Sequence, residues 1–379
     1  MTTTINNEHK KLNVPNSTDK GNVIRNVPHL RFPEFEGEWE KCKFKDVCNI
    51  STGNKNTQDK ADDGIYPFYV RSQTVERINS WTFDGEAILT AGDGVGVGKV
   101  FHHSYGKIGV HQRVYILSDF KCDANYLFHF FSSKFYNRVK RMSAKNSVDS
   151  VRKEMITDMP LSLPCHKEQV QIGHMLSLLD ERIATQSKII EDLKKLKSAI
   201  SENLFKEVKG DVVMLSEICE ISKGKQINGE FLSEKGKYYV MNGGTEPSGY
   251  YNNYNVEANT ISISEGGNSC GYVQFNTSPF WSGGHCYTIQ EIADNVDNLY
   301  LYHFLKSKED AIMKLRIGSG LPNIQKKDLA MFKIKIPTVE QQKAISTFLS
   351  SLERKAEIEE RIQNAMQKEK QYLLRQMFI

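Results

Sequence analysis

The chain has 379 residues, of which 39% are apolar and 25% charged. This is the composition of a globular protein of two or three domains, and it excludes a wholly disordered chain and a disulfide-stapled miniprotein. No apolar run approaches the ~20 residues that span a bilayer, and the opening residues lack the apolar core of a secretory signal. Seven cysteines without paired spacing predict a reducing, cytoplasmic setting.

The charge of the chain is nearly balanced, with 50 basic and 46 acidic side chains. Residues 31–163 carry 19 basic and 17 acidic side chains, whereas residues 211–336 carry 12 and 14. A nucleic-acid-binding domain usually shows a concentrated basic footprint. Any such footprint in this chain must therefore be local and produced by folding.

Residues 1–27 are rich in Asn, Thr and Lys and show no hydrophobic periodicity. We interpret them as a flexible N-terminal tail. The alternative is a clamp that holds a partner subunit.

The most informative feature of the remaining chain is an internal duplication, which indicates two copies of a whole domain with its following helix. Three pairs of segments match in the same order, at separations of 171, 174 and 173 residues: 48–55 with 219–226, 125–134 with 299–308, and 161–180 with 334–353.

Each copy begins with about 130 residues of short strand-like runs, rich in Tyr, Val and Ile and separated by turn residues. A helical stretch follows, at 124–141 in the first copy and 297–315 in the second. The pattern predicts an α+β fold with two similar mixed domains, each containing a curled or barrel-like sheet, related by a pseudo-two-fold internal repeat. The expected strands are at 65–71, 86–91, 113–118, 237–242, 259–264 and 286–290.

Each copy ends in a long helix that begins after Pro164 or Pro337, and Thr338 with Gln341 has the form of a capping box. At 1.5 Å per residue, the helices are roughly 55–60 Å long. Their heptad-like spacing predicts an antiparallel coiled coil. The expected packing residues are Ile172, Leu176, Leu179, Ile183, Ile190, Leu193, Ile345, Leu349, Leu352, Ile362, Met366 and Leu373.

These patterns divide the chain into five parts. The tail at 1–27 is followed by a first mixed domain at 28–163, a helix at 164–210, a second mixed domain at 211–336 and a second helix at 337–379.

Signatures of catalysis are missing from the sequence. The glycine-rich stretch 91–99 lacks the spacing of a phosphate-binding loop, because Asp93 stands where the first glycine is required and Val100 follows Lys99. The histidines and cysteines show no metal-ligand spacing. There is also no Pro-Pro turn of an amino-methyltransferase, no nuclease signature and no nucleophile elbow. We therefore predict a non-catalytic chain that binds no cofactor or metal.

Two variable domains, each followed by the same helix motif, resemble the specificity subunit of type I restriction–modification systems. The opening segment from Pro28 to Trp39 and the turns at 50–53 and 221–224 are also similar to that family. The motif positions are Leu161, Leu163, Pro164, Glu168, Gln169, Ile172, Leu176, Leu179 and Asp180, repeated as Ile334, Ile336, Pro337, Gln341, Gln342, Ile345, Leu349, Leu352 and Glu353.

The resemblance implies a function in defence against foreign DNA. Each domain would be a target-recognition domain that reads one half of a bipartite double-stranded DNA site. The helices would hold the spacing between half-sites and dock two adenine-N6 methyltransferase subunits. Restriction subunits with motor and endonuclease activity would join for cleavage. AdoMet, Mg²⁺ and ATP would be bound by these partners and not by this chain.

The surface that reads DNA should present Arg, Lys and amide side chains on loops. On this basis we selected DNA-binding candidates in both domains. They are Lys55, Arg71, Ser72, Gln73, Lys99, Arg113, Lys145 and Asn146 in the first, and Lys225, Asn242, Asn268, Tyr272, His285, Arg316, Ser319 and Asn323 in the second.

Two other functions remain open on the sequence. The chain could be a coiled-coil interaction scaffold with two ligand-binding modules and no role on DNA. It could also be a stand-alone DNA methyltransferase with degenerate motifs, which would require AdoMet binding by the isolated chain.

Overall fold

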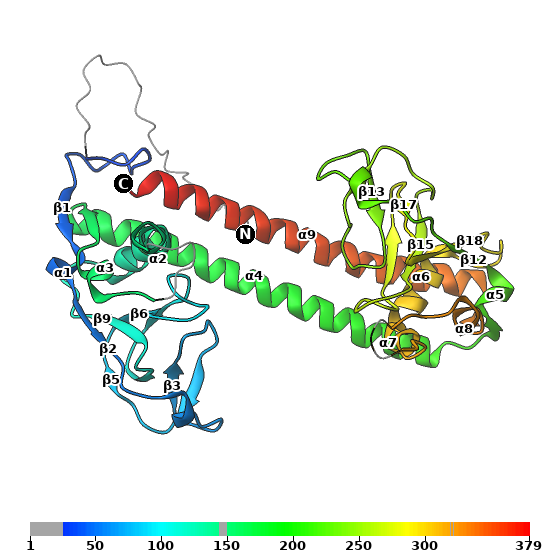
Figure 1. The fold of residues 1–379 in the computed structure, drawn as a ribbon, viewed down its shortest axis with the longest axis horizontal. Coiled ribbons are helices and arrows are strands. Elements are labelled where there is room, and N and C mark those ends of the chain that lie inside the picture. Colours follow the sequence, from blue (N-terminus) through cyan, green and yellow to red (C-terminus); the bar gives the residue numbers. More distant parts are fainter. Residues whose placement is uncertain (1–25, 144–149, 319, 321) are drawn as a thin grey trace, which may run out of the picture. The chain divides into compact units, whose positions relative to one another are not determined.

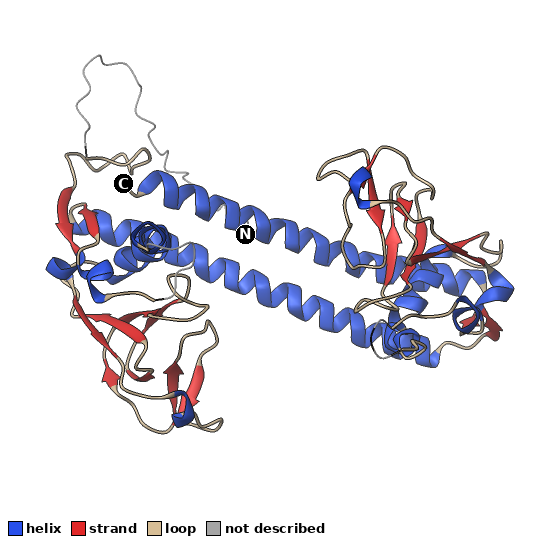
Figure 2. Ribbon diagram, in the orientation of Figure 1, coloured by secondary structure: helices blue, strands red, loops and turns tan. Residues whose placement is uncertain are grey.

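The computed structural model describes residues 26–143, 150–318, 320 and 322–379. The fold divides into two compact units (Figures 1 and 2). Unit 1 comprises the chain up to Thr185 together with Gln363–Ile379, and unit 2 comprises Gln186–Ile362. The candidates Lys145, Asn146 and Ser319 lie outside the described residues.

Unit 1 contains two four-stranded sheets and one two-stranded ribbon, with strand orders β2-β9-β6-β7, β4-β3-β8-β5 and β1-β10. All pairs are antiparallel except β3 with β8. The strands are β1 (Glu40–Lys43), β2 (Asn49–Thr52), β3 (Tyr66–Tyr69), β4 (Glu76–Ile78), β5 (Phe83–Asp84), β6 (Ala87–Ala91), β7 (Phe101–Ser104), β8 (Lys107–Val110), β9 (Val114–Ser118) and β10 (Pro160–Leu163).

Strand β6 explains how the two four-stranded sheets share a core. All five of its residues are buried, because successive side chains point to opposite faces and both faces are covered. Leu89 packs with Ile108 and Val110 of the other sheet, whereas Ile88 packs with the helical layer. That layer contains α1 (Phe44–Val47), α2 (Ala124–Met142) and α3 (Lys153–Thr157). The expected curled sheet is thus a pair of small facing sheets.

Unit 2 repeats this architecture, with strand orders β12-β18-β15-β16, β14-β13-β17 and β11-β19. The position of β5 is occupied in unit 2 by a single antiparallel bridge between Val256 and Phe280. The elements of unit 2 are β11 (Asp211–Met214), α5 (Leu215–Ile218), β12 (Glu220–Lys223), β13 (Tyr238–Met241), β14 (Tyr250–Tyr251), β15 (Thr260–Ser264), β16 (Val273–Asn276), β17 (Trp281–Ser282), β18 (Cys286–Gln290), α6 (Asn298–Ser307), α7 (Glu309–Met313), α8 (Lys326–Ala330) and β19 (Lys333–Ile336). Each unit also has a 3-10 turn, at Thr57–Asp59 in unit 1 and at Gly229–Phe231 in unit 2.

Two long helices, α4 (His166–Glu207) and α9 (Val339–Met377), contribute to both units. α4 begins in unit 1 and ends in unit 2, whereas α9 begins in unit 2 and ends in unit 1. Within unit 1, Leu176 packs in one core with Leu374 and Met377. Within unit 2, Leu204 packs against the equivalent core, which includes Leu349. Each unit therefore contains the start of one helix and the end of the other.

Polar side chains pair the two helices within each unit, and in unit 2 the pairs show that the helices run antiparallel. In unit 1, Lys370 is paired with Asp180. In unit 2, Gln186 Nε2 donates to Glu359 Oε2 over 2.6 Å and Lys197 Nζ contacts Glu353 Oε1 at 2.7 Å, so the numbers rise along α4 as they fall along α9. Asp180 and Glu353 are equivalent residues of the two copies, 173 positions apart, as are Lys197 and Lys370.

The buried positions of the pair follow alternating spacings of four and three residues. All but one of the expected packing residues are buried or half-buried. The exception is Ile362, whose side chain is 42% exposed, so that prediction is wrong. The predicted packing residues pass from Ile183 directly to Ile190, but the polar residue Gln186 between them is also buried between the helices. We call the row of buried positions that the two helices share the seam. The seam consists of Ile172, Leu176, Leu179, Ile183, Gln186, Ile190, Leu193, Lys197, Ile200 and Leu204 of α4, and Leu349, Leu352, Ala356, Glu359, Gln363, Met366, Lys370, Leu373 and Met377 of α9.

The junction between each mixed domain and its following helix is built on one buried glutamine. In unit 1, Gln169 donates to Pro164 O at 2.8 Å and accepts from Asp123 N at 2.9 Å. In unit 2, Gln342 donates to Pro337 O at 2.9 Å and accepts from Asp297 N at 2.7 Å. Asp123 and Asp297 in turn cap the first turns of α2 and α6.

The opening segment of the described chain is fixed to unit 1. Asn26, which lies within the tail expected at 1–27, is buried, and its backbone carbonyl accepts from Trp39 N at 2.8 Å. Arg31 forms a two-point ion pair with Glu168, both at 2.8 Å. None of the helices in the described ranges is both long and apolar enough to cross a membrane.

Candidate nucleic-acid interface

The glycine-rich stretch of unit 1 forms a tight loop after β6, which we call glycine loop 1 (residues 92–98). Gly94 and Gly98 have φ of +75° and +66°, a region that favours glycine. The loop is held by hydrogen bonds from Val97 N to Gly94 O (3.1 Å) and from Val151 N to Gly92 O (2.7 Å). It is therefore a structural turn with an exposed tip.

A carboxylate within this loop positions two arginines. Arg71 Nη1 donates to Asp93 Oδ1 over 3.0 Å, and Arg113 Nε lies 3.7 Å from Asp93 Oδ2. The arginine side chains are 45% and 65% exposed, so their guanidinium groups remain available to a ligand. His111 lies beneath them, and its pKa is lowered by burial and by the charge of Arg71. Lys55 is joined to His111 by a backbone bridge.

Unit 2 contains the same loop 173 residues later, glycine loop 2 (residues 265–271). Gly267 and Gly271 have φ of +76° and +91°, and Cys270 N donates to Gly267 O over 3.1 Å. The segment beside this loop contains a backbone bridge between Ile317 and Asn323, and Asn323 also forms a bridge with Gly266 of the loop. Val97 and Cys270 are buried at the equivalent position of the two loops.

A carboxylate again sits at the base of this loop. Glu265 Oε1 contacts Lys223 Nζ at 2.6 Å and accepts from the Tyr287 hydroxyl at 3.0 Å. The pKa of Tyr287 is raised by burial and by that hydrogen bond. Glu265 Oε2 is buried without a hydrogen-bond partner, with His285 Nδ1 at 3.6 Å. The backbone of His285 is held by Asn242 Oδ1 at 3.2 Å.

The structure gathers several candidates around each loop and places others elsewhere. Lys55, Arg71 and Arg113 meet at loop 1. Four candidates meet at loop 2: Asn242, Asn268, His285 and Asn323. Arg316 is exposed and immediately precedes the pairing of Ile317 with Asn323. Lys225 lies on the connection that follows β12, and its backbone carbonyl accepts a hydrogen bond from the Trp281 indole.

Four candidates contact other parts of their domains. Lys99 lies over the ring of Tyr136 on α2, at 5.0 Å from its centroid. The ring of Tyr272 is covered by Lys306 at 3.9 Å. The amide of Gln73 reaches the Phe101 carbonyl at 3.5 Å, and the hydroxyl of adjacent Ser72 reaches the Thr74 carbonyl.

The loop clusters contain further residues that sequence reasoning missed, among them Asp93, Val95, Gln112, Lys223 and Glu265. Gln112 is exposed, donates to Asn56 Oδ1 at 2.7 Å and is the residue equivalent to His285, 173 positions later. Val95 is 99% exposed at the tip of loop 1, where Asn268 is the equivalent residue. Extending the duplication through the glycine loops would have identified both positions.

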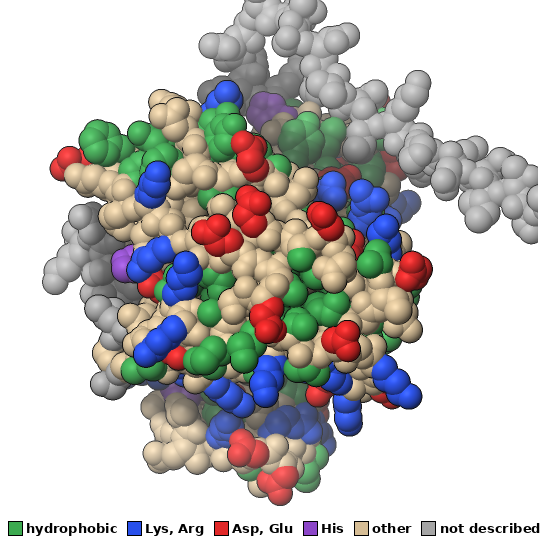
Figure 3. Space-filling view, turned by 90° about the vertical axis from the view of Figure 1, so that its right-hand side faces the viewer, with side chains coloured by type: hydrophobic (Ala, Val, Ile, Leu, Met, Phe, Trp, Pro, Cys, Tyr) green, Lys and Arg blue, Asp and Glu red, His purple; other side chains and the backbone are tan. Residues whose placement is uncertain are grey.

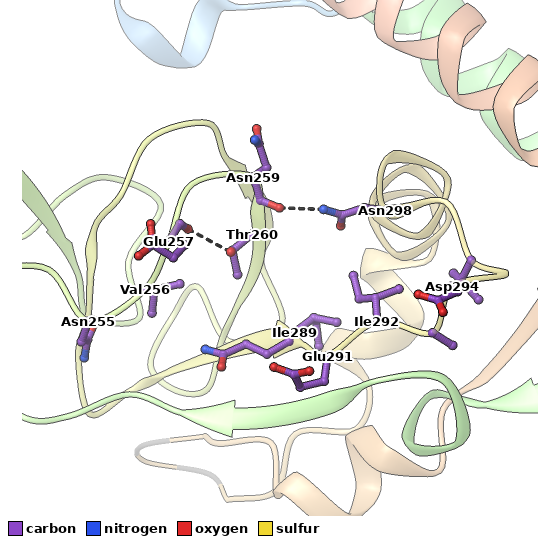
Figure 4. Close-up of a pocket in the computed structure, with 13 residues that line it drawn as sticks. Asn255, Val256, Glu257, Asn259, Thr260, Ile289, Glu291, Ile292, Asp294 and Asn298 are labelled. Atoms are coloured by element: carbon purple, nitrogen blue, oxygen red, sulfur yellow. Dashed lines mark hydrogen bonds between the residues drawn. The ribbon is translucent and has the colours of Figure 1, made fainter.

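Charge of both signs is mixed on one face of unit 2. On the face drawn in Figure 3, Lys and Arg side chains are interspersed with Asp and Glu. A pocket between the ends of β15 and β18 and the start of α6 contains Glu257, Glu291 and Asp294 (Figure 4). Its lining includes no Lys or Arg. An acidic pocket repels phosphate, so this pocket is a poor candidate for contact with a nucleic-acid backbone.

Buried histidines join the domains to the helix pair. In unit 1, His129 lies 3.1 Å from Ser177 Oγ and 3.8 Å from Asp180 Oδ2. In unit 2, His303 lies 2.9 Å from Ser350 Oγ, and Tyr302 donates to Glu353 Oε1 at 3.0 Å. Burial lowers the pKa of His129 to about 3 and that of His303 to about 4. Both imidazoles are therefore neutral at neutral pH.

Comparison with known proteins identifies the family of this two-unit fold. The family model described as the type I restriction modification DNA specificity domain matches residues 36–195 and again residues 207–368. The chain therefore belongs to this family and carries two copies of its domain. The resemblance noted on the sequence and the expected fold class are confirmed.

Curated relatives are specificity subunits. A putative type I specificity subunit of Mycoplasma pneumoniae is 34% identical over 158 residues, 41% of this chain and 40% of that protein. The EcoDI specificity subunit of Escherichia coli is 26% identical over 42% of this chain and 35% of its own length. The chain thus spans less than half the length of these two. The MjaVIII specificity subunit of Methanocaldococcus jannaschii is 26% identical over 91% of this chain and 92% of that protein.

The fold is also that of a solved relative. The crystal structure of the type I restriction–modification S subunit from M. genitalium matches with a TM-score of 0.72 and 18% identity, covering 93% of this chain and 99% of that one.

Proposed function

We propose that this chain is the DNA sequence-specificity subunit of a type I restriction–modification enzyme and performs no catalysis itself. One observation carries the proposal. The two units present equivalent glycine loops, each beside its own polar cluster, on one duplicated frame. Each unit reads one half of a bipartite double-stranded DNA site. The family and the names of the relatives support this function.

The two clusters differ in chemistry, so the half-sites differ in sequence. Loop 1 has Arg71 and Arg113, and arginine donates two hydrogen bonds to the major-groove edge of guanine. Loop 2 has Asn268 and Asn323, and asparagine matches the adenine edge. Asp93 fixes the direction of the arginines before DNA arrives, which lowers the entropy lost on binding.

The helices set the spacing between half-sites in this proposal. At ~1.5 Å per residue, 42 residues of α4 and 39 of α9 extend about 63 and 58 Å. Polar seam residues resist a shift in register, because a slipped helix would bury charges without partners. The Asp180–Lys370 and Lys197–Glu353 pairs therefore maintain a fixed gap.

The outward faces of these helices are the proposed docking surface for two adenine-N6 methyltransferase subunits. Ile189 and Ile362, equivalent residues 173 positions apart, are 40% and 42% exposed. Leu196 and Ile358 are also exposed on the same helices within unit 2. Exposed apolar side chains on a helix favour association with a partner. AdoMet, Mg²⁺ and ATP are cofactors of the methyltransferase and restriction subunits, which complete the enzyme.

The test is the pattern of N6-methyladenine in host DNA, measured by single-molecule sequencing. We expect a bipartite motif with a fixed gap that disappears when the chain is deleted. Exchange of residues 31–160 for another module should change one half-site, and exchange of 211–336 should change the other. Methylation that is unaffected by the deletion would contradict the proposal.

A further inference from the structure

The tip of glycine loop 1 is an apolar side chain held fully in solvent. Val95 is 99% exposed and stands between Gly94 and Gly96. Its neighbours Val97 and Val100 are buried at 3% and 8%. Val97 of the loop and Val100 just after it are thus buried, whereas Val95 projects outward.

The two glycines beside Val95 differ in the space around them, because Gly96 has no room for a side chain whereas Gly94 is open. A Cβ at Gly96 would collide with the carbonyl oxygen of Arg71 and with Val100, and one at Gly98 would meet the Tyr136 ring at 3.2 Å. A Cβ at Gly94 would meet only the Arg71 guanidinium, at 3.9 Å. The small flanks let the backbone of the tip approach a large ligand closely.

Two arginines lie beside the loop that carries this apolar tip. Arg71 lies against the loop, and Arg113 shares its carboxylate, Asp93. An apolar point beside two exposed guanidinium groups complements a DNA groove, where phosphates line the edges and base edges form the floor.

The equivalent tip in unit 2 has an amide. Asn268 is exposed and stands at the same loop position, between Gly267 and Ser269. The loops share their positive-φ glycines and their hydrogen bonds, so they present their tips in the same way within each unit. The loop conformation is therefore repeated in the two units, whereas the side chain at the tip differs.

We propose that Val95 reads a thymine in the half-site of unit 1, through contact with the thymine 5-methyl group in the major groove. This inference rests on the proposed function. The 5-methyl group is the apolar feature of the base edges in the major groove, and aliphatic side chains recognise it. Asn268 makes the matching contact of unit 2, with the donor and acceptor pair of an adenine edge.

The test uses the chain assembled with its methyltransferase subunits and DNA duplexes containing the site found by methylation sequencing. Each thymine of the unit 1 half-site is replaced in turn by deoxyuridine, which removes only the methyl group. One replacement should weaken binding by wild type about fourfold, the value for burial of one methyl-sized group. Val95→Ser should weaken binding to the thymine duplex by a similar factor and should be insensitive to the replacement.

Ile65→Ser is the matched control, because Ile65 is a 69% exposed aliphatic residue of the same unit outside the loop cluster. This variant should keep the full sensitivity to deoxyuridine. The inference is overturned if the half-site contains no thymine, if wild type is insensitive at every thymine, or if Val95→Ser retains the penalty. Failure of the proposed function would give a different result, because no methylation motif would then depend on the chain. In that case the inference about Val95 would fail together with the proposed function.

Discussion

Phe378, near the end of α9, should be a major source of stability for unit 1. Its side chain is 3% exposed and makes edge-to-face contacts with Tyr126 and Phe130, at centroid distances of 5.3 and 5.6 Å. Loss of a buried phenylalanine to alanine costs about 3–5 kcal/mol. We expect Phe378→Ala to lower the opening free energy of α2 by about 4 kcal/mol, which accelerates exchange of its slowest amides roughly 10³-fold.

Hydrogen exchange followed by mass spectrometry localises this effect. Phe205 is the equivalent residue in unit 2, 1% exposed against Tyr300 and Phe304, so Phe205→Ala should affect α6 and leave α2 unchanged. Ile379→Ala is the negative control, because that side chain is 42% exposed. A change in the α2 opening free energy below about 1 kcal/mol in Phe378→Ala would refute the reasoning.

Three further predictions concern the seam, the buried histidines and the loop cluster. Burial is the largest single influence on the pKa of Glu353 and acts to raise it, but the hydrogen bonds and charges around the carboxylate, led by those of Lys197, together outweigh burial and lower the pKa. Lys197→Glu should therefore destabilise unit 2 by about 1–3 kcal/mol in urea unfolding, with recovery in Lys197→Glu/Glu353→Lys. His129 and His303 have folded pKa values below the unfolded 6.5, so the stability they contribute is present above pH 6.5 and is lost as pH falls toward 4, by up to roughly 3 kcal/mol for His303. Arg71→Gln should cost about 1–3 kcal/mol of site-specific binding and relax one position of the methylation motif.

Each of these has a result that contradicts it. Failure of the double charge reversal to regain stability would show that the Lys197–Glu353 pair does not act as a unit. A stability profile between pH 4 and 6.5 that is unchanged by His303→Gln would remove the histidine from the explanation. Equal loss of binding on specific and random duplexes in Arg71→Gln would make Arg71 a phosphate contact.

The presence of two similar domains was predictable, because segments that repeat in the same order at separations of 171 to 174 residues can be found in the sequence alone. The seam was only partly predictable. A search for apolar side chains passed over Gln186, Lys197 and Glu359, which occupy seam positions because each has a partner on the opposite helix. Their pairing is a property of the fold and does not appear in a hydrophobic pattern.

The loop clusters were the least predictable part. Arg71 and Arg113 were selected by residue type, and their meeting at Asp93 depends on the register of β3, β6 and β9. Val95 was missed because an apolar residue beside glycines suggests a strand connection, and its exposure follows from the two positive-φ turns. Lys99 and Tyr272 have the right chemistry but face the helices α2 and α6.

The glutamine junctions have a consequence for how new specificities arise. Gln169 and Gln342 each tie a helix start to the capping aspartate of the domain before it, through hydrogen bonds to residues outside the two glycine loops. The loops can therefore change sequence, or a whole domain can be replaced, while the angle between a domain and its own helix is inherited unchanged. An amide that cannot titrate is well suited to this purpose, because the inherited angle is then independent of pH.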